Sequence, residues 1–229
     1  MRISGLQKLT LLDFPGKTAA TVFLAGCNMR CPFCHNSSLV ESASLDGISE
    51  EELFSYLRKR QGILDGVCIT GGEPTLRRGL YEFLSEIKAL GYLVKLDTNG
   101  TNPEKLKELL DSGVVDYVAM DIKNTPEKYP ETSGTPNLCV DDIKKSVQIL
   151  KSSNVDHEFR TTLVDGFHTE KDVEEIAKWL GEGEKYFLQK FVDSGDILSP
   201  GCKALPDSVS ENYLKAARKY VPLAQLRGM

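Results

Sequence analysis

Short apolar runs alternate with longer segments in which apolar residues recur at helical spacing. The short runs predict strands, because they are rich in β-branched residues and end at Gly or polar residues. The predicted strands lie at 19–24, 67–70, 93–96, 117–120, 159–164 and 186–188. The predicted helices lie at 50–60, 80–90, 103–110, 143–150, 169–180 and 210–220. The alternation predicts about six parallel βα units, an α/β fold with helices covering a sheet, but periodicity does not distinguish an incomplete barrel from an open doubly wound sheet.

Capping signals mark the starts of two predicted helices. Thr169 is followed three residues later by Asp172, which resembles a capping box. Asn102 precedes Pro103, and Pro is favoured at the first position of a helix. These signals support helical segments directly after the strand ends.

The composition is that of an ordinary globular chain of 229 residues, with 41% apolar residues. We expect one domain over 1–229, with an N-terminal extension (1–18), a core (19–191) and a C-terminal extension with a helix (192–229). The 28 basic and 33 acidic residues give a net charge of −5, which argues against nucleic-acid binding. No apolar run reaches the roughly 18–20 residues of a membrane span, and Met1 to Ser4 lack an export pattern. We therefore expect a cytoplasmic protein that binds neither nucleic acid nor membrane.

Unusual polar and Gly-rich segments follow four consecutive predicted strands. Residues 26–36, 71–74, 97–100 and 121–123 each come directly after a strand. Because the carboxyl ends of parallel strands meet at one edge of a sheet, these segments predict one shared site.

Three cysteines are crowded into the first of these segments. Cys27, Cys31 and Cys34 have the spacing Cys-x3-Cys-x2-Cys. Structural zinc needs four ligands, and His35 is a poor fourth one because it adjoins Cys34. Three thiolates suit a four-iron cluster with one iron left open to a substrate. A zinc-bound scaffold protein without turnover remains the alternative from another class.

On Cys27, Cys31, Phe33 and Cys34 the sequence resembles the radical S-adenosylmethionine (SAM) superfamily, and Gly71-Gly72-Glu73-Pro74 matches its second motif. The resemblance implies an incomplete (β/α)6 TIM-like barrel, a [4Fe-4S] cluster held by the three cysteines, and SAM bound at the open iron. It also implies reductive cleavage of SAM to a 5′-deoxyadenosyl radical. Relatives with further clusters carry additional grouped cysteines. The other three cysteines here are dispersed, so we expect one cluster.

The resemblance narrows to the activating enzymes of glycyl-radical enzymes. His35-Asn36, Asp97-Thr98-Asn99-Gly100 and Asp121-Ile122-Lys123 match motifs of that group. Leu12 to Lys17 resembles the short version that activates anaerobic ribonucleoside-triphosphate reductase. The resemblance implies a large glycyl-radical enzyme whose glycine loop enters the barrel, and a flavodoxin- or ferredoxin-type electron donor. The alternatives are an activase of pyruvate formate-lyase or of another glycyl-radical enzyme, and a small-molecule enzyme such as a 7-carboxy-7-deazaguanine synthase-like protein.

The resemblance also implies residues that contact SAM. Phe33, Cys34 and His35 would border the adenine. Gly72, within the segment that begins at Gly71, would contact the methionine amino group with support from Glu73.

Further cofactor contacts are implied at the later strand ends. One of them is Asn99, in the segment that begins at Asp97. Lys123 would meet the SAM carboxylate, and Arg160 would lie near the cofactor. Asp97, Thr98 and Asp121 resemble oxygen ligands of a monovalent cation.

Simpler interpretations remain open at two of these positions: Asp97 as the cap of a turn, and Lys123 as a solvated side chain. The pyruvate formate-lyase activase has a nucleoside-contacting His after the last strand, whereas here Gln189 to Val192 contain none.

Overall fold

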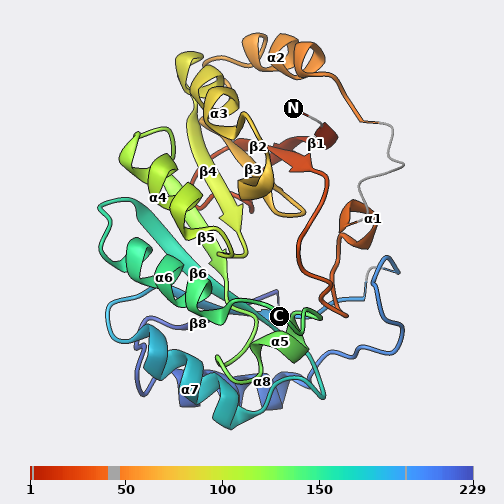
Figure 1. Cartoon of the computed structure of the whole chain (residues 1–229), viewed down its shortest axis with the longest axis vertical. Helices are drawn as coiled ribbons and strands as arrows, with labels where there is room; N and C mark the ends of the chain where they lie inside the picture. Colours follow the sequence, from red (N-terminus) through yellow and green to blue (C-terminus); the bar gives the residue numbers. More distant parts are fainter. Residues whose placement is uncertain (2, 41–46, 194, 229) are drawn as a thin grey trace.

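One eight-stranded sheet organises the chain (Figure 1). The computed structural model describes residues 1, 3–40, 47–193 and 195–228. The strands pair in sequence order; β1 is antiparallel to β2, and every later pair is parallel. The strands are β1 (Ile3–Thr10), β2 (Ala19–Leu24), β3 (Gly66–Gly71), β4 (Leu93–Thr98), β5 (Tyr117–Asp121), β6 (Asp156–Leu163), β7 (Tyr186–Lys190) and β8 (Gln225–Arg227).

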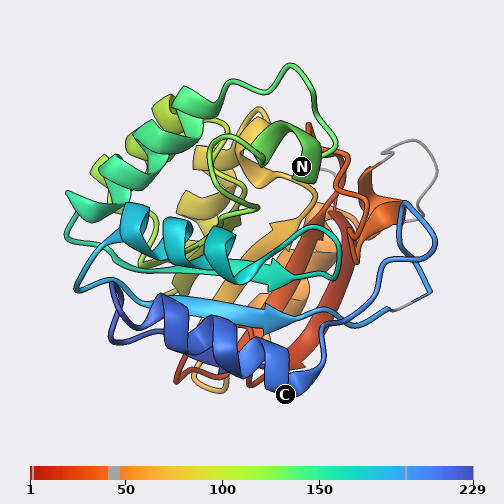
Figure 2. The ribbon, with the colours of Figure 1, turned by 90° about the horizontal axis from the view of Figure 1, so that it is seen from below.

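Strands β2 to β7 correspond to the six predicted strands, and the predicted α/β class is confirmed. The sheet curves, and helices lie along its outer side (Figure 2). Strands β1 and β8 are the two ends of the strand order, so the barrel is incomplete. The sequence pattern did not predict β1 or β8. Strand β1 spans part of the predicted N-terminal extension, and β8 is only three residues long.

The helices follow the strands in alternation. The longer ones are α2 (Glu50–Arg58), α3 (Leu80–Ala89), α4 (Pro103–Asp111), α6 (Val140–Lys151), α7 (Glu170–Leu180) and α8 (Asp207–Ala217). Three short ones are α1 (Ser37–Val40), η1 (Pro74–Leu76) and α5 (Tyr129–Thr132). Both predicted caps form, because Thr169 and Asp172 make a capping box and the Asn102 side chain accepts from the Lys105 backbone. Helix α8 begins and ends three residues earlier than predicted, since it starts directly after Pro206.

The hydrophobic core lies between the outer face of the sheet and the helices. Alternate strand residues such as Val94, Leu96 and Val118 are fully buried there and pack against apolar helix faces. Burying a Leu or Val side chain in this way contributes roughly 1.5–3 kcal/mol. Within the described residues, no helix combines the length and apolar character needed to cross a membrane.

The inner face of the sheet is predominantly polar. The strand residues between those of the core point inward, among them Lys95, Asp97, Asp121 and Arg160. A small apolar cluster of Phe14, Ala19, Tyr117 and Leu93 fills the end of this interior near the strand starts. The interior is therefore open and polar only toward the strand ends.

Candidate active site

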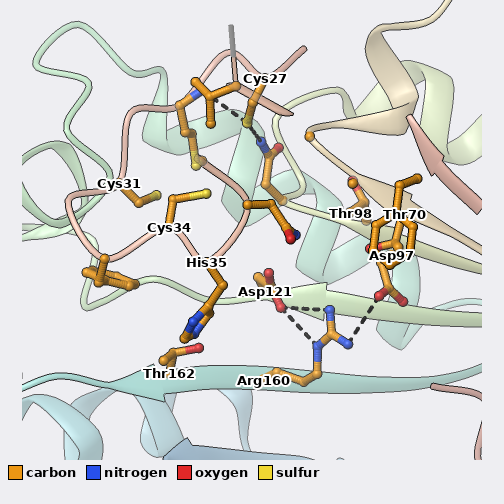
Figure 3. Close-up of a pocket in the computed structure, with 18 of the residues that line it drawn as sticks. Cys27, Cys31, Cys34, His35, Thr70, Asp97, Thr98, Asp121, Arg160 and Thr162 are labelled. Atoms are coloured by element: carbon orange, nitrogen blue, oxygen red, sulfur yellow. Dashed lines mark hydrogen bonds and ion pairs between the residues drawn. The ribbon is translucent and has the colours of Figure 1, made fainter. Parts of the chain in front are cut away.

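A cavity of about 400 Å³ lies at the carboxyl ends of the strands, and most of the predicted site residues line it (Figure 3). This volume is in the range of small-molecule sites. Of the predicted residues, it is lined by Cys27, Cys31, Phe33, Cys34, His35, Gly71, Gly72, Asp97, Thr98, Asn99, Asp121, Lys123 and Arg160. Glu73 is the predicted site residue that does not line it.

The cysteine loop (residues 25–36) follows β2 and is held by backbone hydrogen bonds. The Gly26 N–H donates to Leu39 at 2.7 Å, and the Arg30 N–H donates to Ser133 at 2.9 Å. A tight turn forms where the Cys34 N–H donates to the Cys31 carbonyl at 3.0 Å. These bonds direct all three thiols into the cavity from one loop.

The donor set of the loop fits an iron–sulfur cluster. All three cysteines are free thiols and face one cavity. Among the described residues, no group of three or more His, Cys, Asp or Glu side chains is placed so that it could hold a single metal ion. Burial raises the pKa of the Cys31 thiol to about 11 and also raises that of Cys27. Thiolates at these positions therefore need a cation to stabilise them, and a bound iron cluster would supply it.

The glycines at the end of β3 allow two strand ends to approach closely. The Gly72 N–H donates to Leu24 at 2.8 Å, and the Glu73 N–H donates to Gly26 at 2.9 Å. A Cβ on Gly72 would clash with the Gly26 carbonyl, and Gly71 has a φ of +116°. Gly is required here because a side chain would separate the β3 end from the cysteine loop.

Glu73 ties β3 to β4 instead of facing the cavity. Its side chain is 1% exposed and accepts from the Thr98 hydroxyl at 2.8 Å and from the Asn99 N–H at 2.6 Å. Burial raises its pKa, although these bonds and those from Thr75 oppose the shift. Asn99 in turn donates to Asn28 at 3.0 Å, so the network extends to the cysteine loop.

A chain of alternating charges crosses the inner face beneath the loop. Lys95 pairs with Asp97, and the Arg160 guanidinium contacts Asp97 at 3.3 Å and Asp121 at 2.9 Å. Lys123 contacts the other oxygen of Asp121 at 3.0 Å. Of these cations, only Arg160 and Lys123 line the cavity, together with the carboxylates of Asp97, Asp121 and Asp13. Lys123 is thus one cation at the cavity wall that can meet an anionic group, although the lining as a whole has no surplus of positive charge.

The ion pairs decide the ionisation of the half-buried carboxylates. Burial opposes ionisation of Asp121, but Arg160 and Lys123 outweigh it and lower its pKa. Burial also works against the charge of Lys123, yet Asp121 raises its pKa. Both groups are charged at neutral pH. Lys123 is therefore an ion-paired residue at the cavity wall and not a solvated surface side chain.

The three residues of the predicted cation site line the same cavity, and each already has a partner within the protein. Asp97 and Asp121 share Arg160, whereas the Thr98 hydroxyl donates to Glu73. Asp97 does not cap the following turn either, because Thr98 and Asn99 accept from its backbone N–H groups. The cation ligands stay a prediction.

Phe167 and Phe191, two aromatic residues that the sequence did not single out, support the cysteine loop. Phe33 is 3% exposed and packs against Phe167 with ring centroids 5.6 Å apart. The ring of His35 lies 5.3 Å from Phe191, and burial lowers the pKa of this His. Gln189 lines the cavity, and it belongs to the segment in which the pyruvate formate-lyase activase has a His that this chain lacks.

Comparison with known proteins agrees with this geometry. The model of the radical SAM superfamily matches residues 21–180. The chain is 36% identical to the "Putative glycyl-radical enzyme activating enzyme" of Methanocaldococcus jannaschii, over 98% of this chain and 95% of that protein. It is 29% identical to the pyruvate formate-lyase-activating enzyme of Clostridium pasteurianum, over 82% of this chain and 80% of that enzyme.

The fold is also found among solved structures. A radical SAM methyltransferase from Sphaerobacter thermophilus superposes with a TM-score of 0.74, at 14% identity, over 96% of this chain and 68% of that one. At this identity the likeness concerns the fold alone. Together with the cysteine loop, the family match and the 36% identical relative show that this chain is an enzyme of the radical SAM superfamily and belongs to the glycyl-radical enzyme activating enzymes.

Proposed function

We propose that this protein cleaves SAM reductively and uses the resulting radical to remove an α-hydrogen from one glycine of a partner enzyme. The partner is a large glycyl-radical enzyme, with anaerobic ribonucleoside-triphosphate reductase as the first choice. The observation that carries the proposal is the placement of three thiols of one loop against a cavity whose wall also presents the ion-paired Lys123. The activating-enzyme relatives support the same reaction class.

The family implies a [4Fe-4S] cluster and SAM, and we assign one cluster to Cys27, Cys31 and Cys34. When bound, the cluster supplies the electron that breaks the sulfonium C–S bond, giving methionine and a 5′-deoxyadenosyl radical. The chain's own residues bind and orient SAM. Lys123, at the cavity wall, would pair with the SAM carboxylate in a charge-assisted contact. Gly72, at the cavity wall, would contact the amino group, and its lack of a side chain lets the end of β3 lie against the cysteine loop there.

The glycine must lie within contact distance of the reactive carbon, and water and oxygen must be kept out. The hydrogen atom moves from the glycine Cα to the 5′ carbon, so 5′-deoxyadenosine and a glycyl radical form together. The incomplete barrel supports entry of a partner loop, because β1 and β8 do not pair with each other. The six free cysteines are consistent with the reducing cytoplasm as the place of action.

The predicted monovalent cation is a separate part of the proposal. Arg160 already contacts both carboxylates, so a cation would have to share Asp97 or Asp121 with the guanidinium. We expect SAM affinity to rise with K⁺ or Na⁺ if a cation binds there. If SAM binds with the same affinity when a bulky organic cation replaces K⁺ or Na⁺, the proposed cation site is contradicted.

The test is glycyl-radical formation by anaerobically reconstituted protein. The protein receives dithionite, SAM and either the reductase or pyruvate formate-lyase, and electron paramagnetic resonance records the glycyl signal. We expect the signal with the reductase, and its appearance only with the lyase would reassign the partner. Cys31→Ala should abolish the signal and the bound iron, whereas the control Cys139→Ala, at an exposed thiol, should retain both. No glycyl signal with any such partner would contradict the proposal.

A further inference from the structure

Three arginines, Arg30 within the cysteine loop and Arg77 and Arg78 after the end of β3, do not line the cavity. Arg30 donates from Nη1 to the Cys27 carbonyl at 2.7 Å and to the Met29 carbonyl at 3.0 Å. The Arg77 guanidinium packs over Gly26, where a Cβ would meet it at 2.5 Å. Arg78 is exposed beside it. Two of the three guanidinium groups therefore rest on the backbone of the loop that bears the predicted cluster ligands.

These arginines are not neutralised by the protein itself. Throughout the part of the chain that the structure describes, none of the three lies within ion-pair distance of a carboxylate. Segments 26–40 and 74–79 contain all three and no Asp or Glu. The whole chain carries a net charge of −5, so this positive surface stands against the overall balance.

Two exposed apolar side chains adjoin the arginines along the chain. Leu76 is 37% exposed and Tyr81 is 38% exposed, on either side of Arg77 and Arg78. Protein interfaces are enriched in aromatic and Arg residues, with charged groups at the rim. Encounter complexes of redox proteins are small and depend on complementary charge. Arg30 and Arg77 contact the neighbouring loop residues Cys27 and Gly26, and we call these two arginines, with Leu76, Arg78 and Tyr81 next to Arg77 in the sequence, the arginine surface.

We propose that the arginine surface is the docking site of an acidic one-electron carrier protein that reduces the cluster. The inference rests on the proposed function, which requires an electron from outside the protein. One electron leaves the carrier, which is oxidised, and enters the cluster, which is reduced. Arg30 touches the backbone of Cys27, so a carrier seated here would be separated from the cluster by little more than the loop itself.

The position of the surface favours a carrier over the glycyl-radical partner. The glycine must reach the interior of the cavity, whereas the described lining of that cavity does not include Arg30, Arg77 or Arg78. An electron crosses a protein backbone, but a hydrogen atom moves only between atoms in contact. The arrangement therefore separates electron entry, from outside the loop, from hydrogen transfer inside the barrel.

The test compares two double charge reversals that alter the net charge equally. Arg77→Glu/Arg78→Glu changes the arginine surface, and Arg58→Glu/Lys59→Glu changes exposed residues at the end of α2, before β3 begins. Stopped-flow absorbance follows cluster reduction by reduced flavodoxin, by reduced ferredoxin and by dithionite. At low ionic strength we expect the first variant to slow reduction by the preferred carrier by about tenfold or more. The control should slow it far less, and high salt should narrow the gap.

Dithionite reduction separates docking from damage to the site. We expect dithionite to reduce the wild type and both variants at equal rates. Equal carrier rates in the two variants, or a wild-type rate that does not fall with salt, would overturn the proposal. If the charge reversal impairs dithionite reduction, the carrier rates of the milder variant Arg77→Gln/Arg78→Gln and the salt dependence of the wild-type rate test the docking site instead. A wild type that is reduced by the carrier but forms no glycyl radical would contradict the proposed function and leave the docking site standing.

Discussion

The two faces of the same sheet carry opposite chemistry. On β4, Val94 and Leu96 are fully buried against the helices, whereas Lys95 and Asp97 form an ion pair on the inner face. Successive strand residues point to opposite sides, so this alternation is enough to build both faces. The outer face stabilises the fold, and the inner face places charge next to the cysteine loop. The difference indicates that stability and cofactor binding can be altered separately by substitutions one residue apart.

The largest effect on stability is expected on the outer face. Leu96→Ala removes a fully buried side chain and should lower the free energy of unfolding by about 2–5 kcal/mol, measured by denaturant titration. The protein that remains folded should bind SAM as the wild type does. Leu12→Ala, at a side chain that is 87% exposed, is the control and should change stability by less than about 0.5 kcal/mol. A large loss of SAM affinity in folded Leu96→Ala would break the separation of the two faces.

On the inner face, we expect the largest effect on stability at Arg160, because it contacts two carboxylates. Arg160→Gln leaves Asp97 and Asp121 without their shared cation, and the unfolding free energy should fall by about 3 kcal/mol. Adding Asp121→Asn should restore part of the loss, because it removes one of the carboxylates left behind. Unchanged unfolding of Arg160→Gln would mean that the inner ion pairs contribute nothing to the fold.

Lys123 should affect SAM binding more than stability. Lys123→Met removes the cation assigned to the SAM carboxylate, while Asp121 keeps its contact with Arg160. Calorimetric titration of the reconstituted protein should show SAM affinity about tenfold to a hundredfold lower, since a hydrogen bond to a charged group contributes about 1.5–3 kcal/mol. The matched control is Lys128→Met, which removes the partner of Asp172 and should leave affinity unchanged. Equal losses in both variants would withdraw the assignment.

The smallest expected effect is the dependence of stability on pH in the acid range. The pKa of Asp121 is lower in the folded protein than in the unfolded chain, so its ion pairs contribute full stability above the unfolded value of about 3.9. This contribution falls as the pH decreases below that value toward the folded pKa. The stability difference between the wild type and Asp121→Asn should therefore shrink on acidification below about pH 4. Denaturant midpoints measured from pH 6 to pH 3 would check this, and a difference that grows toward low pH would reverse the sign.

Much of the fold was predictable because its determinants are local. Apolar runs marked β2 to β7, and the Thr169 capping box marked the start of α7. Strand β1 was missed because its central residues are exposed or half-buried and show no apolar run. Strand β8 is too short to leave a pattern, and it pairs only through contacts distant in sequence.

The residue types of the site were predictable, but their partners were not. The cysteine spacing singled out the loop that lines the cavity. Sequence could not indicate that Glu73 turns away from the cavity toward Thr98, or that Arg160 lies between two carboxylates from neighbouring strands. Such pairings depend on register across the sheet, which one strand alone does not specify.

The most direct test of the central claim follows the hydrogen atom itself. A glycyl-radical partner is prepared with deuterium at its glycine Cα and is incubated anaerobically with the reconstituted protein, SAM and dithionite. The account predicts that deuterium appears in 5′-deoxyadenosine as the glycyl signal forms. Release of unlabelled 5′-deoxyadenosine beside an unmodified glycine would contradict it.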